Sequence, residues 1–142
     1  MPTKLHQMIV GLIGRKIHEK GYTIVAFDGK EYMFDGQILN VPIQIKRHRP
    51  DIVGLKFETK EVCVGEAKTR EDLFSKRTKE QLLDYSTTRG MSKGKHIEII
   101  IGIPKSAEED LKKLLHRLNL FEKDFISYIW LPEELVDNGR KN

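Results

Sequence analysis

Two carboxylates and one lysine stand at short spacing in the middle of the chain. Asp51 begins an apolar segment over residues 51–57, and Glu66 and Lys68 end a second one that starts at residue 62. Two converging carboxylates provide hard oxygen ligands, which suit Mg²⁺ or Mn²⁺. A lysine beside such a cation can orient a water molecule or stabilise charge on a phosphate. These residue types therefore indicate metal-assisted hydrolysis, if the fold brings them together.

Pairing of the two segments as a β-hairpin would bring these side chains to one face. A tight turn at Thr59-Lys60 sets Glu58 opposite Glu61, and a four-residue loop from Glu58 to Glu61 keeps the same register. Side chains alternate between the two faces of a strand, so every second residue shares a face. The opposed pairs predicted on this face are Phe57 with Val62, Leu55 with Val64, Val53 with Glu66, and Asp51 with Lys68.

The charged side chains of this hairpin then lie at the end of an otherwise apolar face. Charges at the margin of an apolar surface are costly unless they are paired or bound to a metal. The alternative interpretation is a structural hairpin in which Asp51 and Lys68 form an accidental cross-strand pair. The opposite face of the second strand carries Cys63, Gly65 and Ala67. These small residues would let a helix pack closely against it.

The surrounding sequence predicts the helices and strands that position this hairpin. Apolar residues at helical spacing predict a helix over residues 5–20, and Gly21 is suited to end it. Ser106 and Glu109 have the spacing of a capping box, which predicts a helix over residues 107–118. Another helix runs from a cap at Ser75 or Thr78 to about Thr88. The predicted strands are residues 22–27, 41–46, 51–57, 62–67, 97–103 and 125–131, with Asp-Gly turns at 28–29 and 35–36.

This order of elements predicts an α/β domain, a mixed sheet with helices on its faces. No repeat or linker divides the 142 residues, so we expect one domain over residues 1–136 and a frayed tail over 137–142. With 39% hydrophobic and 32% charged residues, the chain is too apolar for a disordered polymer and too polar for a membrane bundle. Its one cysteine, Cys63, excludes an internal disulfide framework. A cytoplasmic location without a membrane anchor is therefore expected.

Positive charge gathers next to the carboxylates. The net charge of +4 permits a polyanionic partner without requiring one. The basic run Lys46-Arg47-His48-Arg49 leads directly into Pro50-Asp51, where it would hold phosphates at the mouth of a metal site. The alternative is a solvated edge strand, in which basic residues discourage aggregation. The residues expected to contact nucleic acid are Lys46, Arg47, Arg49, Arg70, Lys76 and Arg77.

Pro50-Asp51 followed by Glu66-Ala67-Lys68 resembles the signature of the PD-(D/E)XK nuclease superfamily, the restriction-endonuclease-like proteins. The stretch Gln81-Leu-Leu-Asp-Tyr85 is similar to the Q-x-x-x-Y motif of the RecB-like branch. Its spacing of four places Gln81 and Tyr85 on one helix face. The alternative for this pair is a surface glutamine and a half-buried tyrosine. The resemblance covers motif positions over roughly the first two-thirds of the chain.

The resemblance implies a restriction-endonuclease-like fold with an αβββαβ core, and a role for each motif residue. Asp51 and Glu66 would ligate Mg²⁺ or Mn²⁺, with the backbone carbonyl of Ala67 as a further ligand. Lys68 would position the attacking water or stabilise the transition state. Gln81 would help to hold the site, with Tyr85 nearby. The implied activity is the metal-dependent hydrolysis of phosphodiester bonds in DNA, as an endonuclease.

The family usually adds a group from the first helix, which is a histidine in many RecB-like members and a glutamate in many others. On a helical wheel, His6 lies on the apolar stripe that should face the sheet, Glu19 lies at the edge of that stripe, and His18 points away. His6 is therefore the first choice for an additional metal ligand and Glu19 is the second. The alternative for His6 is a core histidine without a role in the site.

Other functions stay open beside a DNA endonuclease. One is a Holliday-junction or other structure-specific resolvase. Another is a non-catalytic DNA-binding module of a restriction or repair complex, although the intact Asp51, Glu66 and Lys68 argue against it. A third is a plain interaction domain. A homodimer would let two sites cut two strands, but no residue of the sequence indicates one.

Overall fold

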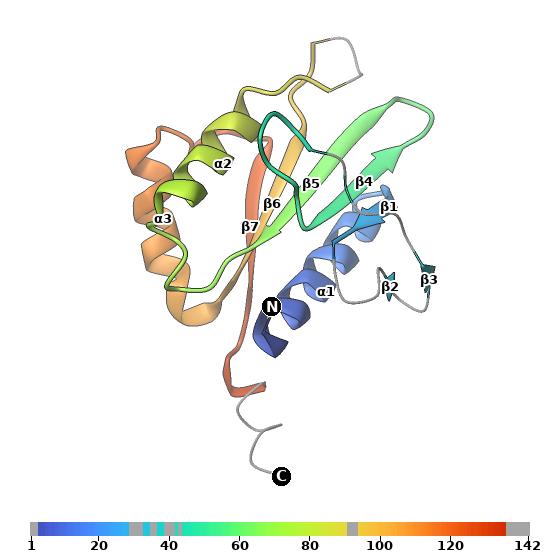
Figure 1. Ribbon diagram of the computed structural model, residues 1–142. Helices are drawn as coiled ribbons and strands as arrows, with labels where there is room; N and C mark the ends of the chain where they lie inside the picture. Colours follow the sequence, from blue (N-terminus) through green and yellow to red (C-terminus); the bar gives the residue numbers. More distant parts are fainter. Residues whose placement is uncertain are drawn as a thin grey trace.

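The computed structural model describes residues 3–28, 33–34, 37–38, 42, 44–90 and 94–135, which form a single α/β domain (Figure 1). The predicted helices over residues 5–20 and 107–118, the helix predicted from a cap at Ser75 to about Thr88, and five of the predicted strands are confirmed to within two residues. None of the described helices is long and apolar enough to cross a membrane. In chain order the elements are α1 (Lys4–Glu19), β1 (Thr23–Phe27), β2 (Met33–Phe34), β3 (Gln37–Ile38), β4 (Ile52–Lys56), β5 (Glu61–Ala67), α2 (Lys76–Ser86), β6 (Glu98–Pro104), the 3₁₀ helix η2 (Lys105–Ala107), α3 (Glu108–Arg117) and β7 (Ile126–Leu131).

The described strands form a five-stranded mixed sheet in the order β1-β4-β5-β6-β7, and β2 pairs with β3 separately. In this sheet β4 pairs antiparallel with β1 and with β5, whereas β6 pairs parallel with β5 and with β7. The helix α1 covers one face of the sheet, while α2 and α3 cover the other (Figure 1). The aliphatic run in β6 is buried because both of its faces are covered. The predicted mixed α/β architecture is therefore confirmed.

The helix α1 lies directly on the sheet because the strands beneath it present glycine. A Cβ atom at Gly102 would lie 2.5 Å from Cγ2 of Ile9, and one at Gly65 would collide with Ile13. Any larger side chain at these positions would push the helix away from the strands. The close helix packing predicted from the small residues of β5 is confirmed.

The predicted register between β4 and β5 is wrong by two residues. Ile52 pairs with Gly65, and continuing this register by one residue places Asp51 opposite Glu66 rather than opposite Lys68. A shift of two residues leaves every side chain on its predicted face, because the side-chain period of a strand is two. The correction therefore brings the two carboxylates closer together than the sequence predicted.

The cause of the shift is the length and position of the hairpin loop. The loop comprises residues 57–60, whereas the sequence predicted a turn at residues 59–60 or a loop over 58–61. Lys60 adopts a φ of 63° and donates its backbone N–H to the carbonyl of Lys56 at 2.7 Å. This left-handed residue closes the loop without a glycine, so the sequence carries no strong turn signal there.

The predicted capping box at the start of α3 is wrong. Ser106 lies inside η2, and α3 begins after Ala107 without a side-chain capping bond. The backbone N–H of Ser106 instead donates to Oε1 of Glu133 at 3.0 Å. Three acidic residues in the first turn of α3, among them Glu109, complement the positive end of the helix dipole.

Three further predictions fall wholly or partly outside the described residues. The Asp-Gly turns at 28–29 and 35–36 and the tail over 137–142 contain residues of which nothing is described. The strand predicted over residues 41–46 is described only in part. There the chain makes a turn at residues 46–47, and Ile45 and His48 pair across it as an isolated bridge. The edge-strand interpretation of the basic run is therefore wrong.

Candidate functional site

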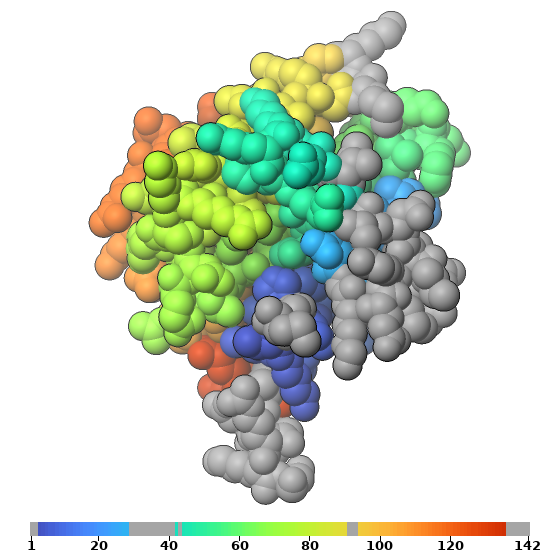
Figure 2. All heavy atoms as spheres, in the orientation of Figure 1, coloured from blue at the N-terminus to red at the C-terminus, as the bar shows by residue number. Residues whose placement is uncertain are grey.

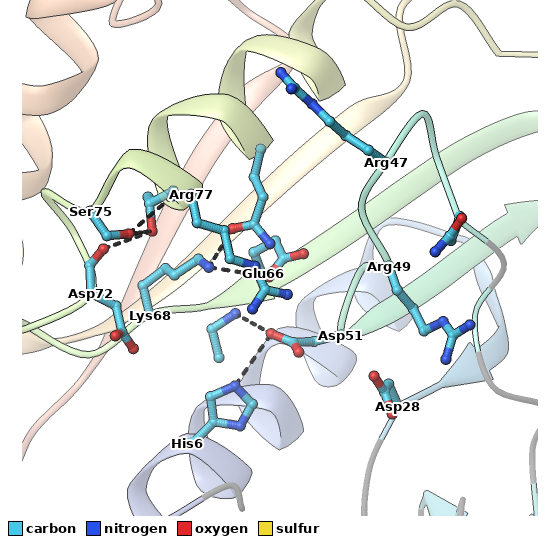
Figure 3. A pocket seen from close by; sticks show the side chains of 14 residues that line it. His6, Asp28, Arg47, Arg49, Asp51, Glu66, Lys68, Asp72, Ser75 and Arg77 are labelled. Carbon is cyan, nitrogen blue, oxygen red and sulfur yellow. Dashed lines mark hydrogen bonds and ion pairs between the residues drawn. The ribbon is translucent and has the colours of Figure 1, made fainter.

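A pocket of about 540 Å³ opens where α1, β4, β5 and the start of α2 meet (Figure 3). It lies at the start of β4 and the end of β5, because these antiparallel strands bring Asp51 and Glu66 to the same edge. The pocket therefore contains most of the residues predicted from the sequence. Those that line it are His6, Arg47, Arg49, Asp51, Glu66, Ala67, Lys68, Arg77 and Gln81.

One oxygen of Asp51 has two nitrogen neighbours, a backbone amide and a histidine ring. Its Oδ2 accepts a 2.8 Å hydrogen bond from the backbone N–H of Ala67. The ring atom Nε2 of His6 lies 3.4 Å from the same oxygen. The side chain of Asp51 is 16% exposed, so the carboxylate faces the pocket from a nearly buried position. These contacts fix its orientation toward Glu66.

Glu66 is the most deeply buried charged side chain of the site, at 3% exposure. Its Oε1 accepts a 2.8 Å hydrogen bond from the phenol of Tyr85, and its Oε2 lies 3.8 Å from Nζ of Lys68. Burial, together with the nearby charge of Asp51, raises the pKa of the Glu66 carboxyl well above its usual range. Two carboxylates forced together in this way favour a bound cation or a shared proton.

Lys68 is oriented by the helix across the pocket. Its Nζ donates to Oε1 of Gln81, which projects from α2. Gln81 is 1% exposed and Tyr85 is 0% exposed, so the surface-glutamine interpretation of this pair is wrong. The helix itself begins at Ser75, whose Oγ accepts a 3.1 Å hydrogen bond from the N–H of Thr78. Gln81 and Tyr85, four residues apart on α2, thus hold Lys68 and Glu66, respectively.

The helix α1 contributes one of its two proposed residues to the pocket. His6 stands in the first turn of α1, beside Asp51. Glu19 is the last residue of the same helix and is exposed, and it does not line the pocket. His18 is exposed as well. The structure therefore brings His6 to the carboxylates and leaves Glu19 at the far end of the helix.

Two arginines have side chains available for a ligand. Arg49 and Arg77 both line the pocket, from opposite walls, and both are exposed. Among the described residues, neither guanidinium makes a hydrogen bond or an ion pair. Arg77 is also close enough to Tyr85 for its charge to act on the phenol. Together they place positive charge, unpaired within the described ranges, in the pocket that holds the two carboxylates.

The other four basic residues predicted to contact nucleic acid differ from Arg49 and Arg77 in their surroundings. Arg47 lines the pocket but forms ion pairs with α2, and Lys46 donates to Oγ1 of Thr87 at 2.6 Å. Arg70 and Lys76 are exposed and lie outside the pocket lining. The structure therefore places Arg47, Arg49 and Arg77 at the pocket, and of these Arg47 is paired with α2.

Five further residues line the pocket that the sequence did not predict as site residues. The backbone N–H of Asp28 donates to the carbonyl of Asp51 at 2.8 Å, which connects β1 to the site. No motif marks this position, since the contact depends on strand order. For the segment before α2, the sequence predicted only the start of a helix. The residues are Asp28, Gln44, Asp72, Ser75 and Thr78.

The donor set fits a hard divalent cation that keeps several water ligands. No three side chains of His, Cys, Asp or Glu in the described ranges gather as a metal cage. Asp51 and Glu66 converge, however, and the Ala67 carbonyl belongs to the same strand end. Mg²⁺ is commonly bound by one or two carboxylates with water completing its shell. The two carboxylates and this carbonyl are the residues that would hold it.

Comparison of the chain with protein-family models, with curated proteins and with solved structures finds no match.

Proposed function

We propose that this protein is a divalent-metal-dependent DNA nuclease that hydrolyses phosphodiester bonds, as an endonuclease. The observation that carries the proposal is the convergence of the Asp51 and Glu66 carboxylates beside Lys68 in one pocket. Buried carboxylates that repel each other are costly to maintain without a function, and a cation between them would remove the cost.

The order of the elements supports a restriction-endonuclease-like type of sheet. With the two-residue strands β2 and β3 set aside, the chain reads α1, β1, β4, β5, α2, β6. This is the αβββαβ order that the PD-(D/E)XK resemblance implies. The RecB-like motif pair also contacts the site, because Gln81 reaches Lys68 and Tyr85 reaches Glu66.

Each site residue has a task in this proposal. Asp51, Glu66 and the Ala67 carbonyl hold Mg²⁺ or Mn²⁺, and His6 orients Asp51 or adds a ligand. The bound cation supplies a lowered water pKa and offsets charge on the phosphate. Lys68 positions the water or stabilises the extra negative charge as water oxygen bonds to phosphorus and the ester P–O bond breaks. No covalent nucleophile is required.

DNA is the proposed partner because two arginines without a partner among the described residues line the same pocket as the carboxylates. Arg77 comes from α2 and Arg49 from the segment before β4, and both line the pocket with the carboxylates (Figure 3). Arginine binds phosphate oxygens in a bidentate manner, and such contacts set the position of a strand without reading its sequence. A structure-specific resolvase, such as one for four-way junctions, uses the same chemistry and is the second candidate activity.

The test is a cleavage panel with Mn²⁺ over single-stranded, duplex, flap and four-way DNA. Wild type should cleave at least one substrate, while Asp51→Ala should cleave none. Asp124→Ala, a substitution in an exposed loop, controls for the preparation. Selective cleavage of four-way DNA would favour the resolvase. Binding without any cleavage would replace the nuclease by a non-catalytic DNA-binding module, and absence of binding and cleavage would contradict the proposal.

A further inference from the structure

A short turn beside the pocket is anchored to α2 by three successive side chains. The turn comprises Ile45 to His48, closed by backbone hydrogen bonds of 2.6 and 3.0 Å between its two ends. Lys46 has a φ of 57°, which lets adjacent side chains point toward the helix. Figure 2 shows this segment in teal against α2 in yellow-green. We call it the 45–48 turn.

Asp84 is the main anchor point on the helix. A single oxygen, its Oδ2, accepts from Nε of Arg47 and contacts Nε2 of His48, both at 2.8 Å. Glu80, one helical turn earlier, lies 3.5 Å from Arg47 and is the weaker partner. The hydrogen bond from Arg47, with that to His48, lowers the pKa of Asp84. His48 is only 5% exposed, so this junction is part of the packed structure.

The helix α2 and the 45–48 turn lead to the two halves of the site. Tyr85 follows Asp84 directly, and its phenol holds Glu66. The His48 ring meets the Tyr85 ring edge-on, with centroids 5.9 Å apart at 81°. From His48 the chain runs through only two residues before it reaches Asp51. Asp84 therefore joins the helix that holds one carboxylate to the segment that carries the other.

We propose that Asp84 is a positioning residue that sets the place of Asp51 relative to Glu66, through His48 and Arg47. Arg47 points away from the carboxylates in Figure 3, so its role is to hold the turn rather than to bind a phosphate. Arg49, which follows the turn, is kept on the pocket wall by the same anchor. The inference rests on the proposed function only in taking Asp51 and Glu66 as the metal-binding pair.

The position of Asp51 has a direct reporter in the backbone N–H of Ala67, which donates to Oδ2 of Asp51. Amide hydrogen exchange of the metal-free protein should therefore show the effect of Asp84→Ala. Loss of the anchor should speed exchange at Ala67 by about tenfold or more, because a charge-assisted hydrogen bond is released. The amide of Ile100, in the central strand β6, should keep its rate.

The matched control is Glu80→Ala, which removes a carboxylate from the same helix but leaves Asp84 in place. It should leave exchange at Ala67 unchanged. Asp84→Asn keeps an acceptor oxygen and should give an intermediate rate, and it serves as the main variant if Asp84→Ala does not fold. Equal acceleration at Ala67 and Ile100, or no change at Ala67, would overturn the proposal.

A second readout follows the cation. The Mn²⁺ concentration for half-maximal stabilisation should rise by about 10–100-fold in Asp84→Ala and stay constant in Glu80→Ala. An unchanged Mn²⁺ requirement in Asp84→Ala would also count against a positioning role. Hydrogen exchange needs neither metal nor substrate, so it tests the positioning role of Asp84 even if wild type cleaves no DNA. Failure of the proposed nuclease function would be seen separately, in the cleavage panel.

Discussion

The phenol of Tyr85 donates a 2.8 Å hydrogen bond to Oε1 of Glu66 across the interface between α2 and the sheet. Both side chains are nearly or fully buried. The bond occupies one oxygen of Glu66 and leaves the other facing Lys68. The carboxylate that would carry the cation is thus fixed by an uncharged partner, which does not neutralise it.

Divalent cations should stabilise the folded protein. Mn²⁺ at a hundredfold excess over its Kd should raise the melting temperature by roughly 5–10 °C, because it binds only the folded state. Asp51→Ala should abolish this shift together with cleavage. Differential scanning fluorimetry with Mn²⁺ and with Mg²⁺ measures the effect. A shift of equal size in Asp51→Ala would place the cation elsewhere.

Substitution of Lys68 should separate binding of the cation from cleavage. Lys68→Met should lower kcat by about 10²–10³-fold, because it removes the charge that acts on the phosphate or its water. The stabilisation by Mn²⁺ should persist, since Lys68 is not a ligand. Gln81→Leu should lower kcat by about 10–100-fold by releasing Lys68. Loss of the Mn²⁺ shift in Lys68→Met would instead show that the lysine is needed for the cation.

Arginine substitutions should differ according to their partners. Arg49→Ala and Arg77→Ala should each weaken DNA binding and reduce the slope of log K against log salt by about 1, because each guanidinium lines the pocket and has no partner in the part of the chain that the structure describes. Arg47→Ala should leave that slope unchanged, since its guanidinium is paired with Asp84. Binding titrations at several salt concentrations measure the slopes. Equal slopes for all three variants and wild type would remove these arginines from the DNA contact.

The raised pKa of Glu66 gives stability a pH dependence of defined sign. The folded state holds the Glu66 proton more tightly than the unfolded state, so this stabilising effect is complete below the ordinary pKa near 4.5 and is lost as the pH rises through the raised value. Without divalent cations, Glu66→Gln should therefore have a higher melting temperature than wild type at pH 8. The increase should be about 2–4 °C for each kcal/mol of unfolding free energy gained when the buried charge is removed.

The same comparison contains its own control. At pH 4 the melting difference between Glu66→Gln and wild type should shrink, because both side chains are then neutral. Addition of Mn²⁺ at pH 8 should stabilise wild type more than the variant. A difference that does not change with pH would mean that Glu66 contributes through packing alone.

The two histidines of α1 provide a further comparison. His6→Ala should lower cleavage by about 10–100-fold, because His6 orients Asp51. His18→Ala should retain wild-type activity, since His18 is exposed at the other end of the helix. Steady-state cleavage assays of the two variants measure this. Equal losses would exclude His6 from the site.

The faces of the hairpin were predictable from the sequence, whereas its register was not. Alternation of apolar and charged residues assigns Asp51, Glu66 and Lys68 to one face for any even shift. The loop length depends on the left-handed conformation of Lys60, which the residue type does not favour. The candidate site survived the error because a shift of two residues preserves the face.

The tertiary contacts of the basic run over residues 46–49 were not predictable from its own residues. Arg47 and His48 are paired with Asp84, 36 or more residues along the chain, and charge patterns within the run carry no sign of this contact. Glu80 and Asp84 stand four apart on α2, which marks an acidic helix face. That spacing was the available signal. The local sequence indicated where positive charge lies, but only the tertiary structure shows which of these residues pair with α2.

The hairpin loop at residues 57–60 lies at the end of β4 and β5 opposite to the pocket, about 17 Å away along the strands. All four of its residues are exposed. The loop is consequently a position for a fluorophore or an affinity peptide. A fluorophore there would report on the rotational diffusion of the protein, and an affinity peptide would let the protein be captured on a solid support. In both cases the pocket would stay open to solution.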